Sequence, residues 1–432
     1  MVLSLAARAA FVAIAYQYVQ RGIEGHPWLF VEQDTTAYMI RAVDFVQGRG
    51  FMATPPETRR TPLYPVILAG ALRLTGQQGM DLATLRPENA GAWAIFRSPL
   101  LWPMVLLHHA LGMLTTLLVY LIGLRLSQSI RASWLAALAL DTSPVRLATD
   151  TVMLPYVVMG ACLALCVWLY LRARDHQRIG WLAASGLCLG LATLAQPLPL
   201  FLWIGCLGLI IGFWAGRAPR LAAALVFAVT ATALPTAWQI HNGLRSGVYQ
   251  YSVHGLTSLF QFKVPIAIAE RDRIGFGEAE ARLQTAADER VARIERQRGR
   301  ALNSFELERE WGAVALDYIR RDPVSYAAAM ARSVPRLLFD QAGRRTGVYD
   351  RALMAGLLAL SVLAIIRFAR LGEWHHLLML VGLAGYFIAL TVPVLPGYIR
   401  FKAVVMPYLG ILAAVGLAQL GAWRSSHRQV AG

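Results

Sequence analysis

The chain has 432 residues, of which 57% are hydrophobic and only 15% charged, and its mean hydropathy is +0.48. Soluble domains carry about 25% charged residues, so this composition excludes an ordinary soluble domain and indicates a membrane protein. The net charge of +16 comes almost wholly from arginine, because Lys263 and Lys402 are the only lysines. No basic stretch is interleaved with stacking aromatic residues, so we expect no nucleic-acid partner.

Apolar runs of about 17 to 25 residues predict membrane-spanning helices. The first run contains Arg8 and lacks a cleavage signal, so we expect a retained and tilted first span. Ten runs qualify, and they cover approximately residues 3–20, 100–124, 132–149, 152–171, 179–195, 199–215, 220–238, 351–367, 375–395 and 403–421.

Two long polar segments, residues 21–99 and 239–350, interrupt these runs. We therefore divide the chain into an N-terminal membrane module at 1–238, which includes the first polar segment, a second polar segment at 239–350, and C-terminal spans at 351–432. The second segment contains charge-rich helical patterns. One of them begins with a predicted capping box of Asn303 and Glu306.

Arginines in the short loops predict the orientation. If the N-terminus is cytoplasmic, the short outer loops hold only Arg146, Arg400 and Lys402. The positive-inside rule then favours an N-in, C-in topology with both polar segments outside. The inner loops hold the larger number of basic residues, namely Arg125, Arg131, Arg172, Arg174, Arg178, Arg217, Arg220, Arg367, Arg370, Arg424 and Arg428.

The same topology gathers ionisable side chains on the outer side. Loops that carry Asp141 and Asp150 join Arg400 and Lys402 there. Ionisable groups near membrane depth are costly unless they serve a function, so we expect one extracytoplasmic site.

Residues 31–51, "VEQDTTAYMIRAVDFVQGRGF", predict a helix on the outer side. Asp34 is the expected N-cap of a helix from about 35 to 47, and Gly48 is its expected stop. Glu32 is expected to be a solvated neighbour. The following "RRTPLYPVILAGALRLTG" is too short and too interrupted by proline to span, so we expect an interfacial helix.

Several stretches together resemble one family. "DTTAYMIRAVDFVQGRGF", "RRTPLYPVILAGALRLTG", "LPTAWQIHNGLRSG" and "YIRFKAVVMPYLGILAAVGL" are similar, in this order, to segments of the dolichyl-phosphate-mannose protein mannosyltransferase superfamily. Bacterial members of this superfamily include the transferases that add aminoarabinose to lipid A. The resemblance implies the GT-C glycosyltransferase fold, an all-α polytopic membrane protein with about ten transmembrane helices and interfacial helices in two long outer loops.

The resemblance also implies a reaction. Such enzymes move a sugar from a polyprenyl phosphate to an acceptor hydroxyl with inversion, here on the outer face of a bacterial cytoplasmic membrane. The acceptor is an envelope glycan, a lipid or a protein. The reaction needs a carboxylate to accept the hydroxyl proton and cations to hold the phosphate. No cofactor is required, and the need for a divalent metal stays open.

The acidic residues implied by the resemblance are Asp34 as the general base and Asp150 as a second acid. For each there is a structural alternative, because either carboxylate can cap a helix. The chain departs from the family where Pro155 and Tyr156 replace an acidic pattern, and where Gln196 replaces an arginine.

The cations implied for the donor phosphate have structural alternatives as interfacial or membrane-edge anchors. The candidate phosphate ligands are Arg59, Arg60, His241, Arg400 and Lys402, and His241 stands where the family has arginine. Tyr38 and Arg41 share the helical face of Asp34, with Arg41 as its expected partner, and Asn242 is expected to support the phosphate site.

A transporter or flippase for a lipid-linked substrate is the competing class. Transporters are expected to have two related halves, with interrupted helices and ionisable groups near the bilayer midplane. The sequence contains no such halves, and its charges gather near one surface, which favours the transferase.

Overall fold

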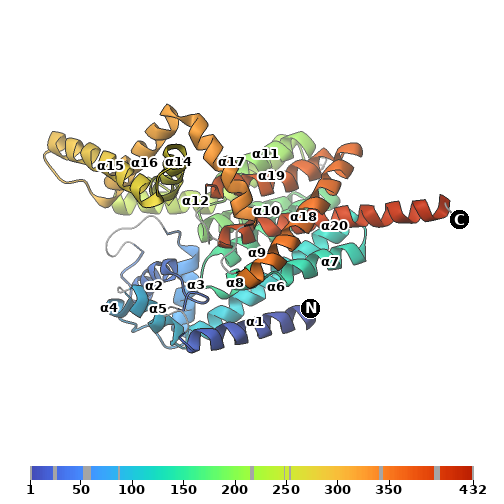
Figure 1. Ribbon diagram of the computed structural model, residues 1–432, viewed down its shortest axis with the longest axis horizontal. Coiled ribbons are helices and arrows are strands. Elements are labelled where there is room, and N and C mark those ends of the chain that lie inside the picture. Colours follow the sequence, from blue (N-terminus) through green and yellow to red (C-terminus); the bar gives the residue numbers. More distant parts are fainter. Residues whose placement is uncertain are drawn as a thin grey trace.

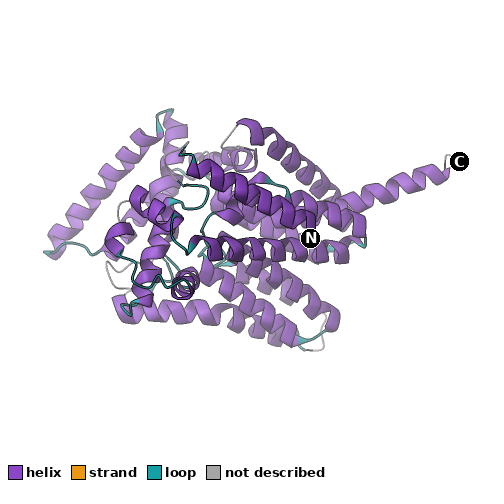
Figure 2. Ribbon diagram, turned by 90° about the horizontal axis from the view of Figure 1, so that it is seen from below, coloured by secondary structure: helices purple, strands orange, loops and turns teal. Residues whose placement is uncertain are grey.

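The computed structural model describes residues 2–22, 27–51, 60–85, 88–214, 218–247, 249–252, 254–339, 344–393 and 399–430. All regular secondary structure in these ranges is helical, as the sequence predicts. Figure 1 shows the long helices packed side by side, with the two polar segments at one end of the bundle and the termini toward the other. Figure 2 shows the bundle from below and again draws only helices and loops in the described parts. Both polar segments therefore share one side of the bundle.

Within the described ranges, seven helices are long and apolar enough to cross a membrane. They are α1 (Val2–Gln20), α6 (Leu101–Ser127), α9 (Tyr156–His176), α12 (Arg220–Ser246), α18 (Arg344–Arg370), α19 (Trp374–Thr391) and α20 (Ile399–Val430). Two further predicted spans form shorter apolar helices, α10 (Ile179–Ala195) and α11 (Leu202–Phe213). The predicted fold class is confirmed, but the number of ten spans is not.

The span predicted at 132–149 is broken into two helices. Helix α7 (Ile130–Asp141) ends where Ser143 adopts an extended conformation, and α8 (Pro144–Thr151) begins at the next residue. Proline suits the first position of a helix and cannot continue a preceding one, which explains the break. After the break, α8 packs against α6 and α20.

Helix α20 is the centre of the bundle. Its segment Arg400–Trp423 is largely buried, and it packs against α6, α7, α18 and α19. The backbones come close where small residues meet: a Cβ at Gly416 would lie 2.0 Å from the carbonyl oxygen of Leu360 on α18. Such close approach through small residues is how helices pack in membranes. Helix α1, by contrast, is mostly exposed along the edge of the bundle.

The described parts of the first polar segment form the helices α2 (Gln33–Val46), α3 (Leu63–Leu74), α4 (Leu82–Leu85) and α5 (Glu88–Phe96). The prediction that Asp34 caps α2 is wrong, because Glu32 is the N-cap and Asp34 lies inside the first turn. The predicted stop is confirmed: Gly48 has a φ of 76°, which glycine adopts readily. Helix α3 stays short, as predicted, and buries Tyr64 and Leu68 against the bundle.

The second polar segment forms a separate small core. Its elements are α13 (His254–Ser258), the π-helical η1 (Leu259–Lys263), α14 (Val264–Asp272), α15 (Phe276–Arg298), α16 (Ser304–Arg321) and α17 (Pro323–Phe339). Phe260, Ile268 and Leu283 pack together there. The capping box of Asn303 and Glu306 at the start of α16 is present, as predicted.

Candidate active site

Two carboxylates lie at the start of α2. Glu32 is the N-cap, and its main-chain N–H donates to the hydroxyl of Thr35 at 3.1 Å. That hydroxyl donates to the carbonyl oxygen of Met153 at 3.1 Å, which ties the start of α2 to the segment after α8. Asp34 lies in the first turn, where the helix dipole stabilises a negative charge.

Two arginines from distant segments pair with these carboxylates. Arg60 Nη2 lies 2.6 Å from Asp34 Oδ1, and Arg400 Nη2 lies 3.0 Å from Asp34 Oδ2. Arg400 also donates to Glu32, a residue 368 positions away in the sequence. All four side chains keep between 12% and 32% of their surface exposed, so solvent or a ligand can reach them. We call Glu32, Asp34, Arg60 and Arg400 the cavity cluster.

Aromatic side chains hold the two guanidinium groups. Arg60 lies over the ring of Tyr38 at 4.9 Å, and Arg400 lies over the ring of Tyr156 at 5.7 Å. The Tyr38 hydroxyl donates to Gln196 Oε1 at 3.4 Å. Cation–π contacts of this kind fix the direction of an arginine without removing its charge.

Burial shifts two pKa values at the site. It raises the pKa of Glu32, and the neighbouring Asp34 adds to this effect while Arg400 opposes it. Burial also raises the pKa of Tyr38, so this phenol stays protonated at neutral pH. Glu32 thus binds a proton more readily than an ordinary glutamate.

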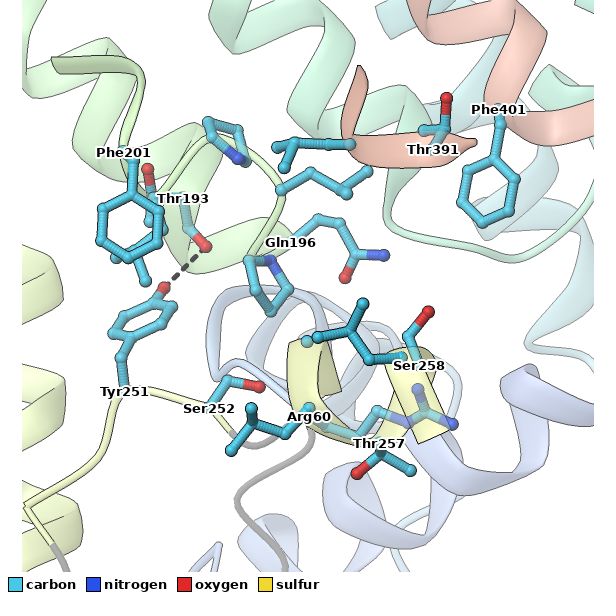
Figure 3. Close-up of a pocket in the computed structure, with 18 of the residues that line it drawn as sticks. Arg60, Thr193, Gln196, Phe201, Tyr251, Ser252, Thr257, Ser258, Thr391 and Phe401 are labelled. Carbon is cyan, nitrogen blue, oxygen red and sulfur yellow. Dashed lines mark hydrogen bonds between the residues drawn. The ribbon is translucent and has the colours of Figure 1, made fainter. Parts of the chain in front are cut away.

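The cavity cluster opens into a cavity of about 1460 Å³ between the bundle and the second polar segment. Apolar side chains such as Leu198, Phe201 and Ile204 line much of its wall. Figure 3 shows Tyr251 on one side of the cavity, where its hydroxyl donates to the carbonyl oxygen of Thr193 at 2.6 Å. The cavity therefore combines a charged end with apolar walls, which suits an amphiphilic ligand.

Some predicted site residues lie at this cavity and others do not. Asp34, Arg60 and Arg400 lie together, and Tyr38 packs under Arg60. Arg59 lies outside the described residues. Arg41 was predicted to partner Asp34, and the structure pairs its guanidinium with Asp44, one turn along α2, at 3.6 Å.

Lys402 is also directed away from the cavity. Its ammonium group is buried and donates to Asp350 on α18. Residues two apart on a helix point in different directions, so Arg400 and Lys402 cannot both face one site. The prediction of a shared phosphate site for both residues is therefore wrong.

His241 and Asn242 do not line the cavity either. His241 stacks on Trp238, with ring centres 5.1 Å apart. Asn242 is buried, and its Nδ2 donates to the carbonyl oxygen of Gln250 at 2.9 Å and to that of Tyr251 at 3.3 Å. Asn242 thereby fixes the main chain that carries Tyr251 into the cavity.

Asp150 is buried in another group of charges. Arg8 of α1 lies 2.7 Å from Asp150 and 2.5 Å from Asp141, and Arg146 lies 3.3 Å from Asp150. These four side chains are at most 5% exposed, and none lines the cavity. We call Arg8, Asp141, Arg146 and Asp150 the buried cluster. The structure thus separates Asp150 from Asp34, because α8 turns it toward α1 and α6.

Sequence reasoning missed two charged residues among those described as lining the cavity, Glu32 and Lys263. Glu32 was expected to be solvated, but it shares Arg400 with Asp34. Its spacing of two residues from Asp34 was the available signal. Lys263 also lines the cavity, and its rarity as one of only two lysines was the only sign in the sequence. Among the described residues, no group of three or more histidine, cysteine or acidic side chains is placed to hold a metal ion.

Residues 90–238 match the family model described as dolichyl-phosphate-mannose-protein mannosyltransferase. No curated protein matches the chain. The crystal structure of the Archaeoglobus fulgidus oligosaccharyltransferase tethered with an acceptor peptide is similar at a TM-score of 0.52 and 12% identity, covering 99% of this chain and 51% of that one. The chain thus spans about half the length of that protein.

Two further structures are similar at lower scores. Archaeal oligosaccharyltransferase AglB from Archaeoglobus fulgidus, in complex with an inhibitory peptide and a dolichol-phosphate, has a TM-score of 0.48 and 14% identity, with coverage of 98% and 51%. ArnT from Cupriavidus metallidurans, bound to undecaprenyl phosphate, has a TM-score of 0.39 and 15% identity, with coverage of 96% and 77%.

The helical bundle, its two polar segments at one end and the likeness at a TM-score of 0.52 define a polytopic membrane protein of the GT-C fold. The match of residues 90–238 to the dolichyl-phosphate-mannose-protein mannosyltransferase family model covers about a third of the chain, so the family is shown as a similarity of that part.

Proposed function

We propose that this protein is an inverting glycosyltransferase that takes a sugar from a polyprenyl-phosphate donor. The acceptor is an envelope glycan, a lipid or a protein on the outer face of a bacterial cytoplasmic membrane. The observation that carries the proposal is the cavity, because it joins carboxylates and arginines at one end to apolar walls. A sugar phosphate on a long apolar chain has the matching distribution of polar and apolar groups.

The chemistry assigned to the site is a single displacement. The acceptor hydroxyl oxygen attacks the anomeric carbon, its proton passes to Asp34, and the bond from the anomeric carbon to the phosphate oxygen breaks. The electron pair of that bond stays on the phosphate, whose added charge needs cations. Arg60 and Arg400 are the guanidinium groups at the charged end of the cavity.

Both arginines form ion pairs with the carboxylates of the cavity cluster. A phosphate that enters between them competes for the same N–H donors, since guanidinium binds phosphate as well as carboxylate. Transfer of Arg60 and Arg400 to the phosphate would leave Asp34 with fewer donors, and therefore more basic, when the acceptor arrives. Donor binding and activation of the base are coupled in this scheme.

The test is Asp34→Asn in the purified full chain, reconstituted with a polyprenyl-phosphate-linked sugar. Loss of general-base catalysis lowers transfer by about 10²- to 10⁴-fold. The matched control is Asp175→Asn, because Asp175 has similar exposure, 35% against 30%, and is also paired with an arginine, but does not line the cavity. Transfer at the wild-type rate by the folded Asp34→Asn protein would refute the assignment.

The acceptor is identified by comparing lipid and envelope extracts of a deletion strain with its parent by mass spectrometry. We expect one glycan modification to disappear and a sugar-linked polyprenyl phosphate to accumulate. A transporter or flippase would instead leave purified protein without transfer activity on any extract, while the lipid-linked sugar changes its side of the membrane.

A further inference from the structure

Lys263 is a third cation of the cavity, beside Arg60 and Arg400. It is the last residue of the π-helical turn η1, in the second polar segment, and it lines the cavity. Its Nζ donates to the main-chain carbonyl oxygens of Leu390 and, at 3.1 Å, Val392. These carbonyls lie at the C-terminal end of α19, on either side of Thr391, which borders the cavity in Figure 3.

The partners of Lys263 differ from those of the two arginines. Arg60 and Arg400 are each paired with a carboxylate of the cavity cluster. The hydrogen bonds of Lys263 go to neutral carbonyl groups, and burial alone lowers the pKa of its amine to about 8. Carbonyls at a helix C-terminus attract a cation but do not neutralise it.

The charges that line the cavity are therefore unequal. Three cations face two carboxylates among its described lining residues, which leaves one positive charge in excess. That excess resides on Lys263, because the arginines and carboxylates of the cavity cluster compensate one another. A sugar linked to a lipid through a phosphodiester carries one negative charge, so its entry would neutralise the cavity.

We propose that Lys263 binds the phosphate group of the lipid-linked donor, as a third cation beside Arg60 and Arg400. This inference rests on the function proposed above. Lysine carries its charge on a flexible four-carbon stem, so its ammonium group can leave the carbonyls of α19 for a charged acceptor. When the bond to the sugar breaks, the phosphate gains a second negative charge, and Lys263 then stabilises the leaving group more than the bound donor.

The first test uses the wild-type protein, because the chain offers an internal control. Lys263 and Lys402 are its only lysines, and Lys402 is buried and bonded to Asp350. An amine-reactive reagent at pH 8 should modify Lys263, whose lowered pKa leaves much of the amine neutral, and should spare Lys402. Undecaprenyl phosphate should protect Lys263 more strongly than the uncharged alcohol undecaprenol. Equal protection by the two lipids would overturn the proposal.

The second test compares Lys263→Gln and Lys263→Arg in binding measurements with the same two lipids. Glutamine retains a donor for the carbonyls of α19 without the charge, whereas arginine retains the charge. Loss of a charged hydrogen bond should weaken binding of undecaprenyl phosphate by about ten- to a hundredfold in Lys263→Gln. Binding of undecaprenol should stay unchanged, and Lys263→Arg should bind the phosphate within a fewfold of wild type.

The outcomes separate this inference from the proposed function. If wild-type protein binds undecaprenyl phosphate no better than undecaprenol, the proposed lipid-phosphate donor is wrong. If wild type prefers the phosphate and Lys263→Gln retains that preference in full, only the role of Lys263 is refuted. If Lys263→Gln binds both lipids equally more weakly than wild type, while Lys263→Arg binds both as wild type does, Lys263 only supports the cavity wall. That result also overturns the proposal.

Discussion

The cavity cluster and the buried cluster each contain two arginines and two carboxylates, but they differ in access. The side chains of the cavity cluster are 12% to 32% exposed, and those of the buried cluster are at most 5% exposed. Ion pairs that solvent can reach are screened and contribute less to stability than fully buried pairs. A ligand that enters the cavity can therefore take over one partner of such a pair. Buried pairs cannot exchange, because a charge left without its partner away from water is very costly.

Packing around the buried cluster restricts it further. A Cβ at Gly112 of α6 would lie 2.1 Å from Asp150 Oδ2 and 2.7 Å from Arg8 Nη1, so these side chains occupy the space next to the helix backbone. Thr116 donates to Asp141 at 3.0 Å from the same helix. The buried cluster therefore joins α1 to α6, α7 and α8. The same kinds of side chain hold helices together in one place and are available to a ligand in the other.

Arg8→Met should have the largest effect, and that effect should be on the stability of the fold. It leaves Asp141 without its cation, and the loss of one partner of a buried ion pair costs about 3–5 kcal/mol. Because α1 is mostly exposed along the bundle, Arg8 is its main polar attachment. We expect a large fall in the thermal midpoint and yield of the detergent-purified protein.

The control for this variant is Arg21→Met, which removes an exposed arginine just beyond the end of the same helix. It should leave the thermal midpoint within about 1 °C of wild type, since surface substitutions change stability by less than about 0.5 kcal/mol. Equal midpoints for Arg8→Met and wild type would show that the buried cluster is not a structural attachment.

Arg400→Ala should leave the fold intact and weaken ligand binding instead. The loss of a charged donor to the phosphate should reduce affinity for undecaprenyl phosphate by about ten- to a hundredfold. Acceptor binding should change far less, so the KM for the donor should rise more than the KM for the acceptor. Arg125→Ala is the matched control, because Arg125 is also partly exposed and paired with an aspartate, but lies outside the cavity. An equal loss of affinity for donor and acceptor, or no loss for either, would indicate that Arg400 is only a membrane anchor.

Local features could be predicted from the sequence because their causes are local. Apolar length fixes the long helices, and the side chains of Asn303 and Glu306 cap α16 regardless of the rest of the fold. The break at Ser143 was missed, although Pro144 was the available signal. Because residues 132–149 are almost continuously hydrophobic, they were predicted to form one span in spite of Pro144.

The composition of the candidate site could be predicted only in part. Asp34, Arg60 and Arg400 were predicted because the topology and the family resemblance bring their segments to one side. Lys402 was assigned wrongly because the rotation of α20 about its axis depends on packing with α18. The partner of Arg8 could not be predicted, since the contact with Asp150 depends on how α1 lies against α6.

Glu32→Gln should have the smallest effect on the affinity for undecaprenyl phosphate. It should raise this affinity, whereas Arg400→Ala lowers it. Glu32 competes with an incoming phosphate for Arg400, so its neutral analogue should raise the affinity for undecaprenyl phosphate. Exposed ion pairs are worth about 0.2–1 kcal/mol, so the increase should be at most about fivefold. Glu270→Gln is the control, because Glu270 is likewise a glutamate paired with arginine, with Arg332 and Arg336, but away from the cavity. Titration of the purified proteins with undecaprenyl phosphate at pH 7.5 measures the difference. A loss of affinity in Glu32→Gln would mean that Glu32 orients Arg400 for the phosphate, and that the pairs of the cavity cluster do not exchange.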